Sequence, residues 1–135
     1  MNQPATNRES IERLFTAVLS NDRATADSLL DPDLTVYEPD GLPYAGVYKG
    51  HKGWWDLMEK INATWLDMKV EVVDLIGEPN GKQFGVYIRL SGCAAVSRKS
   101  FTHMLFERYT VVNRKLTEVH PHYWDTKALA ELNSR

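Results

Sequence analysis

The sequence predicts an α+β domain, in which one curved antiparallel sheet holds helices against its concave side. Three observations indicate this class. Apolar residues near the N-terminus recur at helical spacing, the chain from residue 67 onward alternates apolar and polar residues as strands do, and Asn80-Gly81 is typical of a tight hairpin turn. Helices followed by an antiparallel meander favour two packed layers around a single core.

The first helix is expected over residues 7–20. Thr6 and Glu9 have the spacing of a capping box, in which side chains satisfy backbone N–H groups at the helix start. The apolar residues lie at i, i+3, i+4, i+7 and i+8 and so form one stripe: Ile11, Leu14, Phe15, Val18 and Leu19.

Three more helices are expected. Asn21-Asp22 ends the first helix and caps a shorter one over residues 23–30. The third helix, residues 51–65, has an apolar stripe of Trp54, Met58, Ile61 and Trp65. A short helix over residues 126–133 closes the chain.

Five strands are expected, over residues 34–38, 67–76, 83–90, 98–112 and 116–124. The segment that follows the first strand is punctuated by prolines and glycines: Pro39, Gly41, Pro43, Gly46 and Gly50. Because proline cannot donate to a strand ladder and glycine allows unusual backbone angles, we expect a tightly folded loop here.

The bulk composition fits one globular domain spanning residues 1–135, since 43% of the residues are hydrophobic and 25% are charged. A formal net charge of −2 with scattered Lys and Arg gives no attraction to nucleic acid. There is no apolar run of the ~20 residues that a membrane span needs, and no signal-peptide pattern, so a soluble, cytoplasmic protein is expected. The single Cys93 excludes an internal disulfide.

Three motifs carry a resemblance to a known family: Glu38-Pro39 at the end of the first strand, Leu-Pro-Tyr-Ala-Gly-Val-Tyr-Lys-Gly over residues 42–50, and Tyr-Trp-Asp-Thr over residues 123–126. Together they resemble the nuclear transport factor 2-like superfamily, in particular its SnoaL-like, polyketide-cyclase-like branch. The resemblance covers nearly the whole chain and implies a cone-shaped nuclear transport factor 2-like (cystatin-like) α+β barrel with a closed apolar end and an open mouth. It also implies a small-molecule pocket inside the cone and a homodimer formed through the sheet face.

Glu38 is the first candidate for catalysis. Ketosteroid isomerase, a member of the superfamily, has its general base immediately before a proline at the end of the first strand, and Glu38-Pro39 is similar to that motif. A carboxylate in an apolar pocket has its pKa raised, which makes it a usable base near neutral pH. A solvent-exposed glutamate is the other interpretation; if the strand alternation is reversed, Tyr37 takes the pocket position.

The long strand places Arg108 and Glu107 on opposite faces. Phe106-Glu-Arg-Tyr-Thr110 resembles the strand of limonene epoxide hydrolase that bears an inward arginine, which implies that Arg108 faces the pocket and stabilises an oxyanion. Thr110 stands where that hydrolase needs an aspartate. An ion pair of Arg108 with Glu38 or Glu107 is the alternative.

The oxyanion hole of ketosteroid isomerase does not transfer to this chain. It needs a first-helix tyrosine, where Leu14 or Phe15 stands, and a neutral aspartic acid on the long strand, where the resemblance places Arg108. A steroid isomerase of that mechanism is therefore not expected.

Three histidines cluster late in the chain, but their spacing does not suit a metal site, and no metal is expected. Pro121 between His120 and His122 indicates a bulge, so which of the two faces the pocket stays open. The inward one would act as a general acid opposite Glu38, with Asp125 orienting it; the alternative is that both lie on the dimer face.

Substrate-binding roles are expected for seven apolar or aromatic residues: Tyr37, Tyr44, Trp54, Trp55, Met104, Phe106 and Tyr123. Trp54 and Trp55 could stack on a flat ligand at the pocket mouth, although large aromatic residues at helical spacing more often pack in a core. No glycine-rich phosphate loop is present, so no cofactor is expected.

The function predicted from these residues is a cofactor-independent general acid–base enzyme acting on a small hydrophobic aromatic or polycyclic hydroxy-carbonyl compound. Isomerisation, dehydration, and aldol-type cyclisation or cleavage share the first proton transfer and stay open. A non-catalytic binding or dimerisation module is the main alternative. An epoxide hydrolase is a further one, which would need a second inward carboxylate such as Asp125.

Overall fold

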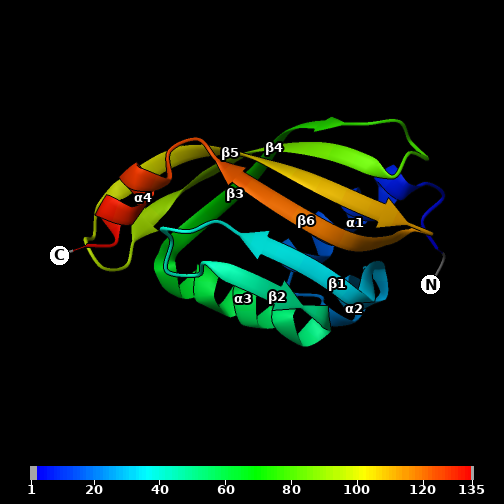
Figure 1. Cartoon of the computed structure of the whole chain (residues 1–135), viewed down its shortest axis with the longest axis horizontal. Helices are drawn as coiled ribbons and strands as arrows, with labels where there is room; N and C mark the ends of the chain where they lie inside the picture. The colour runs from blue at the N-terminus through cyan, green and yellow to red at the C-terminus, as the bar shows by residue number, and fades with distance from the viewer. Residues whose placement is uncertain (1–2, 135) are drawn as a thin grey trace.

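The computed structural model describes residues 3–134. Two helices come first, followed by two strands, a third helix, four strands and a terminal helix (Figure 1). Their bounds, in chain order, are α1 Asn7–Leu19, α2 Arg23–Leu29, β1 Leu30–Glu38, β2 Gly46–Lys49, α3 Gly50–Thr64, β3 Trp65–Ile76, β4 Gln83–Ala94, β5 Ser100–Val112, β6 Lys115–Tyr123 and α4 Thr126–Leu132. The predicted α+β class is confirmed.

All strands belong to one six-stranded sheet in the order β2-β1-β6-β5-β4-β3. The last four strands form the expected antiparallel meander, with Asn80-Gly81 in the turn between β3 and β4. β1 and β6 pair in parallel, so the sheet is mixed rather than wholly antiparallel. A hairpin can join only antiparallel strands, and here most of the chain separates the two partners.

The predicted helix starts are confirmed by their caps. Thr6 accepts a hydrogen bond from the Glu9 N–H at 3.1 Å, and Glu9 in turn accepts one from the Ala5 N–H at 2.6 Å. Asp22 caps α2 by accepting from the Thr25 N–H at 3.2 Å. Asp125 caps α4 in the same way, through the Ala128 N–H at 3.0 Å.

One strand was not expected. The segment Gly46–Lys49, interpreted as loop, pairs antiparallel with β1 from Thr35 opposite Lys49 to Glu38 opposite Gly46. The sequence does not predict this strand because β2 is short, contains a glycine and, as an edge strand, has few alternating apolar residues. β1 also begins at Leu30, earlier than the expected residue 34.

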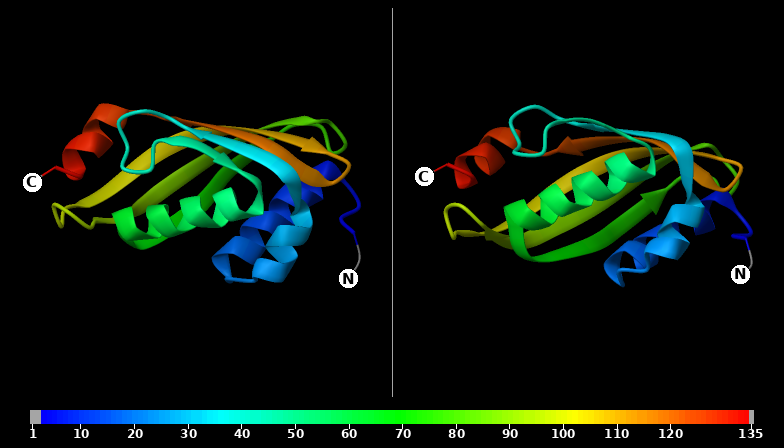
Figure 2. Two further views of the ribbon diagram at one scale, coloured as in Figure 1. Left: turned by 60° about the horizontal axis from the view of Figure 1, so that its bottom comes forward. Right: turned by 90° about the horizontal axis from the view of Figure 1, so that it is seen from below.

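The sheet curves around α1 and α3, which cover its concave side (Figure 2). Inward-facing residues alternate along each strand, as Phe84, Val86, Ile88 and Leu90 do on β4. The core fills the space between sheet and helices, but not completely. None of the helices within residues 3–134 is long and apolar enough to cross a membrane.

Candidate active site

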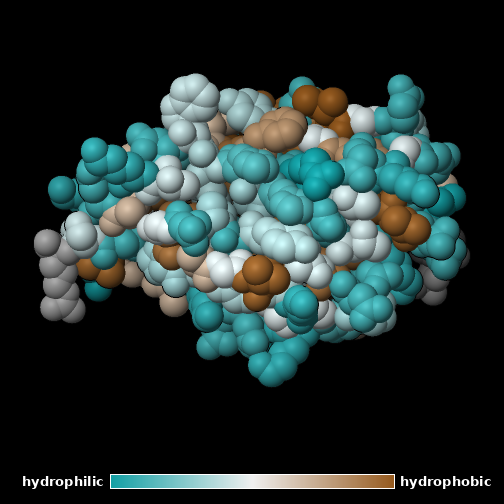
Figure 3. All heavy atoms as spheres, viewed as in Figure 1, coloured by the Kyte–Doolittle hydropathy of each residue, from teal (hydrophilic) through white to brown (hydrophobic). Residues whose placement is uncertain are grey.

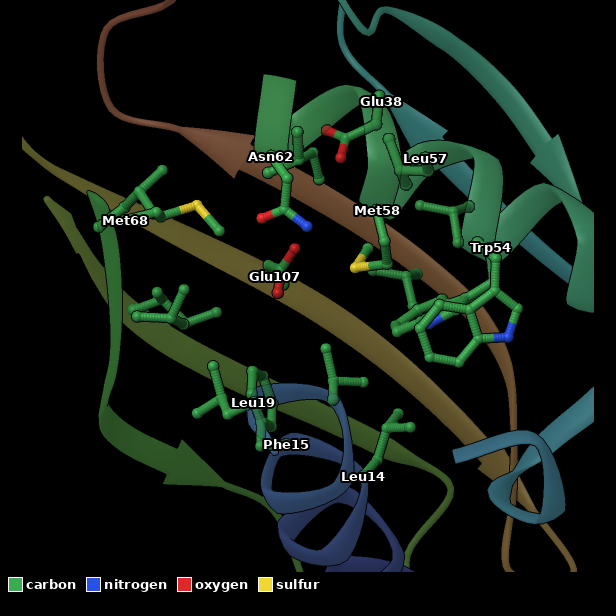
Figure 4. A pocket seen from close by; sticks show the side chains of 18 of the residues that line it. Leu14, Phe15, Leu19, Glu38, Trp54, Leu57, Met58, Asn62, Met68 and Glu107 are labelled. Carbon is green, nitrogen blue, oxygen red and sulfur yellow. The ribbon is translucent and has the colours of Figure 1, made fainter. Parts of the chain in front are cut away.

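A cavity of about 790 Å³ lies between the concave face of the sheet and helices α1 and α3 (Figure 4). This volume falls within the range typical of small-molecule sites. Its walls are mostly apolar and come from both helices and from five strands; they include Leu14, Phe15, Val18, Val36, Leu57, Met58, Ile61, Met68, Val70, Ile88, Leu90, Leu105 and Val119.

Glu38 reaches this cavity from the end of β1. Leu34 and Val36 point inward before it, so strand alternation turns Glu38 inward as well, and its residue is only 7% exposed. Its Oε1 atom has no hydrogen-bond partner among the described residues. Burial, with a smaller contribution from the nearby Glu107, raises the pKa of Glu38 to about 9. This carboxyl is therefore protonated at neutral pH.

Glu107 is the second carboxyl in the same cavity, and it comes from β5 (Figure 4). The Tyr109 hydroxyl donates a hydrogen bond to its Oε1 at 3.0 Å. Burial raises the pKa of Glu107 to about 7, while the bond from Tyr109 acts in the opposite direction. Glu107 thus ionises before Glu38 does, because its charged form has a donor and that of Glu38 has none.

Tyr123 forms part of the same wall and begins a chain of hydrogen bonds that leads away from it. Its hydroxyl lies 2.9 Å from that of Tyr44, and the Trp65 indole N–H donates to the Tyr44 hydroxyl at 3.0 Å. Burial raises the pKa of both tyrosines, and the Glu38 carboxyl raises both further. These hydroxyls stay neutral and hold the wall next to Glu38 in place.

The helices supply the remaining polar and aromatic groups. Trp54 and Trp55 line the cavity from α3, with Trp54 only 6% exposed and its indole N–H unpartnered among the described residues. Figure 4 shows the Asn62 amide of α3 also pointing into the cavity. Besides the exposed Asn21, Arg23 and Glu59, the lining offers the carboxyls of Glu38 and Glu107 and the Asn62 amide within apolar and aromatic walls. This arrangement can move protons on a bound ligand.

The expected inward position of Arg108 is wrong. Its guanidinium lies on the outer face of the sheet, where it donates to Glu118 at 2.9 Å and to Gln83 at 3.1 Å. The inward residue of this pair is Glu107, so the resemblance to limonene epoxide hydrolase gave the wrong strand alternation. Arg108 also pairs with neither Glu38 nor Glu107.

Neither candidate histidine faces the cavity. His120 stacks on Tyr37 with ring centroids 4.4 Å apart, and its Nε2 lies 2.8 Å from the Glu118 carboxylate, all on the outer face. His122 is exposed beside a small outer hollow next to Phe106 and Trp124. β6 keeps its alternation through Pro121, which is buried, so both flanking histidines point outward.

Four of the seven expected substrate-binding residues lie elsewhere. Tyr37, Met104 and Phe106 belong to the outer face, because each is adjacent in sequence to an inward residue. Tyr44 is fully buried behind Tyr123 and does not line the cavity. Trp54, Trp55 and Tyr123 do line it. Their binding roles stay predictions.

Sequence reasoning missed Glu107 as a site residue, although a signal was present. Leu105, Tyr109 and Val111 share its face of β5 and are all buried, whereas the other face carries Arg108 and Thr110. The more apolar face is normally the inner one. The second inward carboxylate is thus Glu107, while Asp125 caps α4 and donates its backbone N–H to His103 at 3.0 Å.

Within residues 3–134, no group of three or more His, Cys, Asp or Glu side chains is arranged to hold a metal ion.

Comparison with known proteins identifies solved structures that share this fold. No family model and no curated protein matches the sequence. Among solved structures, an NTF2-like protein of Burkholderia thailandensis has a TM-score of 0.85 and 19% identity, with 96% of this chain and 98% of that chain covered. TerC, co-crystallised with polyporic acid, has a TM-score of 0.81 and 20% identity over 94% and 97% of the two chains.

A third similar structure is a candidate SnoaL-like polyketide cyclase of Jannaschia, with a TM-score of 0.79 and 14% identity over 100% of this chain and 98% of that chain. At such identities the likeness concerns the fold. The chain has the nuclear transport factor 2-like fold that the sequence motifs indicated.

Proposed function

We propose that this chain is a cofactor-independent general acid–base enzyme that acts on a small, flat, mostly apolar hydroxy-carbonyl compound. One observation carries the proposal: two carboxyls, Glu38 and Glu107, lie in one apolar cavity, and a buried oxygen atom of Glu38 has no hydrogen-bond partner within residues 3–134. An unsatisfied buried oxygen is costly unless a ligand completes it. Two carboxyls whose pKa values differ are suited to serve as acid and base.

The two roles follow from the surroundings of each carboxyl. Glu107, stabilised by the Tyr109 hydroxyl, ionises first and accepts a proton from the carbon beside the ligand carbonyl or from a hydroxyl. Glu38, still protonated, donates its proton to the carbonyl oxygen, so that an enol forms and the total number of protons is unchanged. This assignment makes Glu107 rather than Glu38 the base.

The enol can continue in three ways. Return of the proton to another carbon gives isomerisation, departure of a β-hydroxyl with a proton as water gives dehydration, and attack of the enol carbon on a second carbonyl forms a carbon–carbon bond. The shared fold with a candidate polyketide cyclase supports the inclusion of the third, aldol-type outcome. All three begin with the same proton transfer.

The test is hydrogen–deuterium exchange at the acidic carbons of 2-tetralone in D₂O, followed by proton NMR. Wild type is expected to exceed the buffer rate, and Glu107→Gln and Glu38→Gln are each expected to lower the enzymatic rate by about 10²–10⁴-fold. Glu118→Gln on the outer face is the matched control and is expected to leave the rate unchanged.

A second candidate is a non-catalytic module that binds an apolar ligand. The observation in its favour is that Glu38 is protonated and can hydrogen-bond a ligand without transferring a proton. Saturable binding of 2-tetralone without any exchange above buffer would support this module and contradict the enzyme.

A homodimer formed through the outer sheet face stays a proposal. Tyr37, Tyr87 and Phe106 are each 38–39% exposed there, and Trp124 is 87% exposed. Figure 3, which looks onto the outer side of β5 and β6, shows hydrophobic residues scattered among hydrophilic ones. Sedimentation velocity of wild type and of Tyr87→Glu tests it: a dimer that dissociates in the variant supports the proposal, and a monomeric wild type contradicts it.

A further inference from the structure

Arg23 is the only basic residue among those that line the cavity in the described part of the chain. It is the first residue of α2, is exposed, and forms no ion pair with another described residue. Its guanidinium lies 4.3 Å from the centroid of the Trp55 ring, in a cation–π contact. One positive charge is thus held at the cavity without a partner of opposite charge.

The ring beneath this charge is fixed in turn. The Trp55 indole N–H donates to Asp27 Oδ1 at 2.7 Å, which joins α3 to α2. Asp27 stands one turn after Arg23 but directs this oxygen to the indole instead of to the guanidinium. Arg23 and Trp55 therefore form a platform, with an aromatic face below and unused N–H donors of the guanidinium above.

The interior of the cavity carries acidic groups, in contrast to the basic Arg23. Glu38 and Glu107 are its two buried carboxyls. Burial raises the pKa of both, and the nearby Glu107 raises that of Glu38 further. An anionic group placed beside them would be repelled by the Glu107 carboxylate once it ionises. Arg23 and Glu59, the other acidic or basic residues of the lining, are both exposed. The exposed Arg23 and the two buried carboxyls thus favour different ligand groups.

We propose that the ligand carries a carboxylate that binds Arg23 on the Trp55 platform, while its uncharged hydroxy-carbonyl end lies between Glu38 and Glu107. The proposal rests on the function proposed above and narrows its substrate class to hydroxy-carbonyl acids. Planar guanidinium and carboxylate groups can pair through two parallel hydrogen bonds, which also fixes the orientation of the ligand.

Two probes that differ only in charge test the proposal: 6-hydroxy-2-naphthoate and its neutral amide, 6-hydroxy-2-naphthamide, titrated into the protein by calorimetry. In wild type the carboxylate is expected to bind at least as tightly as the amide, with one molecule per chain. Arg23→Gln is expected to weaken the carboxylate by about threefold to fivefold, as for an exposed ion pair, and to leave the amide unchanged.

Two further variants serve as controls. Arg23→Lys keeps the charge and is expected to recover most of the carboxylate affinity. Arg89→Gln makes the same change of charge on the outer face, where Arg89 pairs with Glu71 at 2.9 Å, and is expected to alter neither probe. Raising the salt concentration is expected to weaken only the carboxylate, since exposed charges are screened.

The failures are distinguishable. If the amide binds and the carboxylate does not, or if Arg23→Gln leaves their affinity ratio unchanged, the Arg23 proposal is overturned while the acid–base function stands. If neither probe binds wild type, both are contradicted, because the cavity then does not accept a flat hydroxylated aromatic molecule.

Discussion

The inner and outer faces of the sheet both carry glutamates, but those on the inner face are buried and the one on the outer face is paired and in contact with solvent. Glu38 and Glu107 on the inner face form no ion pair with another described residue, and their pKa values are raised by burial. Glu118 on the outer face accepts a hydrogen bond from Arg108 and lies against His120, in contact with solvent. Residues adjacent in sequence, such as Glu107 and Arg108, therefore belong to different chemical settings. The comparison teaches that the position of a carboxyl on the pleated strand, more than its identity, makes it a candidate acid or base.

The largest expected effect concerns packing on the two faces of β5. Leu105→Ala removes a 5% exposed side chain from the inner face and is expected to lower the free energy of unfolding by about 2–5 kcal/mol. Phe106→Ala removes a 39% exposed ring from the outer face and should cost about 1 kcal/mol or less. Urea unfolding measures both. Equal losses would mean that the outer face is as buried as the inner one, as in a tight dimer.

The second effect is the pH dependence of stability. Glu38 binds its proton more tightly in the folded protein, where its pKa is about 9, than in the unfolded chain, where it is near 4.5. The contribution of Glu38 protonation to the free energy of unfolding is thus fully present below about pH 4.5. It is lost progressively as the pH rises through 9. The slope is about 1.4 kcal/mol per pH unit, or up to about 4 kcal/mol between pH 5 and pH 8.

Glu38→Gln is expected to remove the part of the slope that Glu38 contributes, because glutamine resembles the protonated acid and does not ionise. The part contributed by Glu107, whose pKa is raised to about 7, is expected to remain. Urea unfolding at a series of pH values checks this, with Glu118→Gln as the outer-face control. A Glu38→Gln protein that loses stability between pH 5 and pH 8 as steeply as wild type would show that Glu38 is solvated.

The third effect is on the pKa of Glu107. Tyr109→Phe removes the hydroxyl that donates to the Glu107 carboxylate at 3.0 Å, so the pKa of Glu107 is expected to rise by about one to two pH units. Carbon-detected NMR titration measures the shift. Tyr37→Phe on the outer face is the matched control, with no change expected. An unchanged Glu107 pKa in Tyr109→Phe would remove the reason for assigning Glu107 as the base.

The smallest effect is expected at Arg108. Arg108→Gln breaks an exposed ion pair with Glu118 and should change the free energy of unfolding by about 0–1 kcal/mol. Its rate of 2-tetralone exchange is expected to equal that of wild type. A large loss of exchange in this variant would restore the catalytic role that the sequence resemblance implied for Arg108.

The fold could be predicted from the sequence because its signals are local. Helical spacing in α1, the caps at Thr6 and Asp22, and the Asn80-Gly81 turn each depend on a few neighbouring residues. The edge strand β2 was missed because only its pairing with β1 defines it.

The site was predicted less well, because it depends on which face of each strand is buried. For Glu38, the Glu38-Pro39 motif at the end of the first strand correctly indicated that the side chain faces the cavity. For β5, the similarity to another enzyme outweighed the apolar pattern of Leu105, Tyr109 and Val111, and Arg108 was chosen in place of Glu107. The parallel pairing of β1 with β6 brings Glu38 and Glu107 to one cavity, and no local pattern indicates that contact.

The strict alternation of β5 has an evolutionary consequence. Insertion or deletion of one residue before Glu107 would turn the strand over, so that Arg108 would enter the cavity and Glu107 would leave it. The sign of charge inside the cavity would then reverse without any change of side-chain type. One ancestral sheet could in this way give rise to descendants that bind ligands of opposite charge, separated by a slip of a single position.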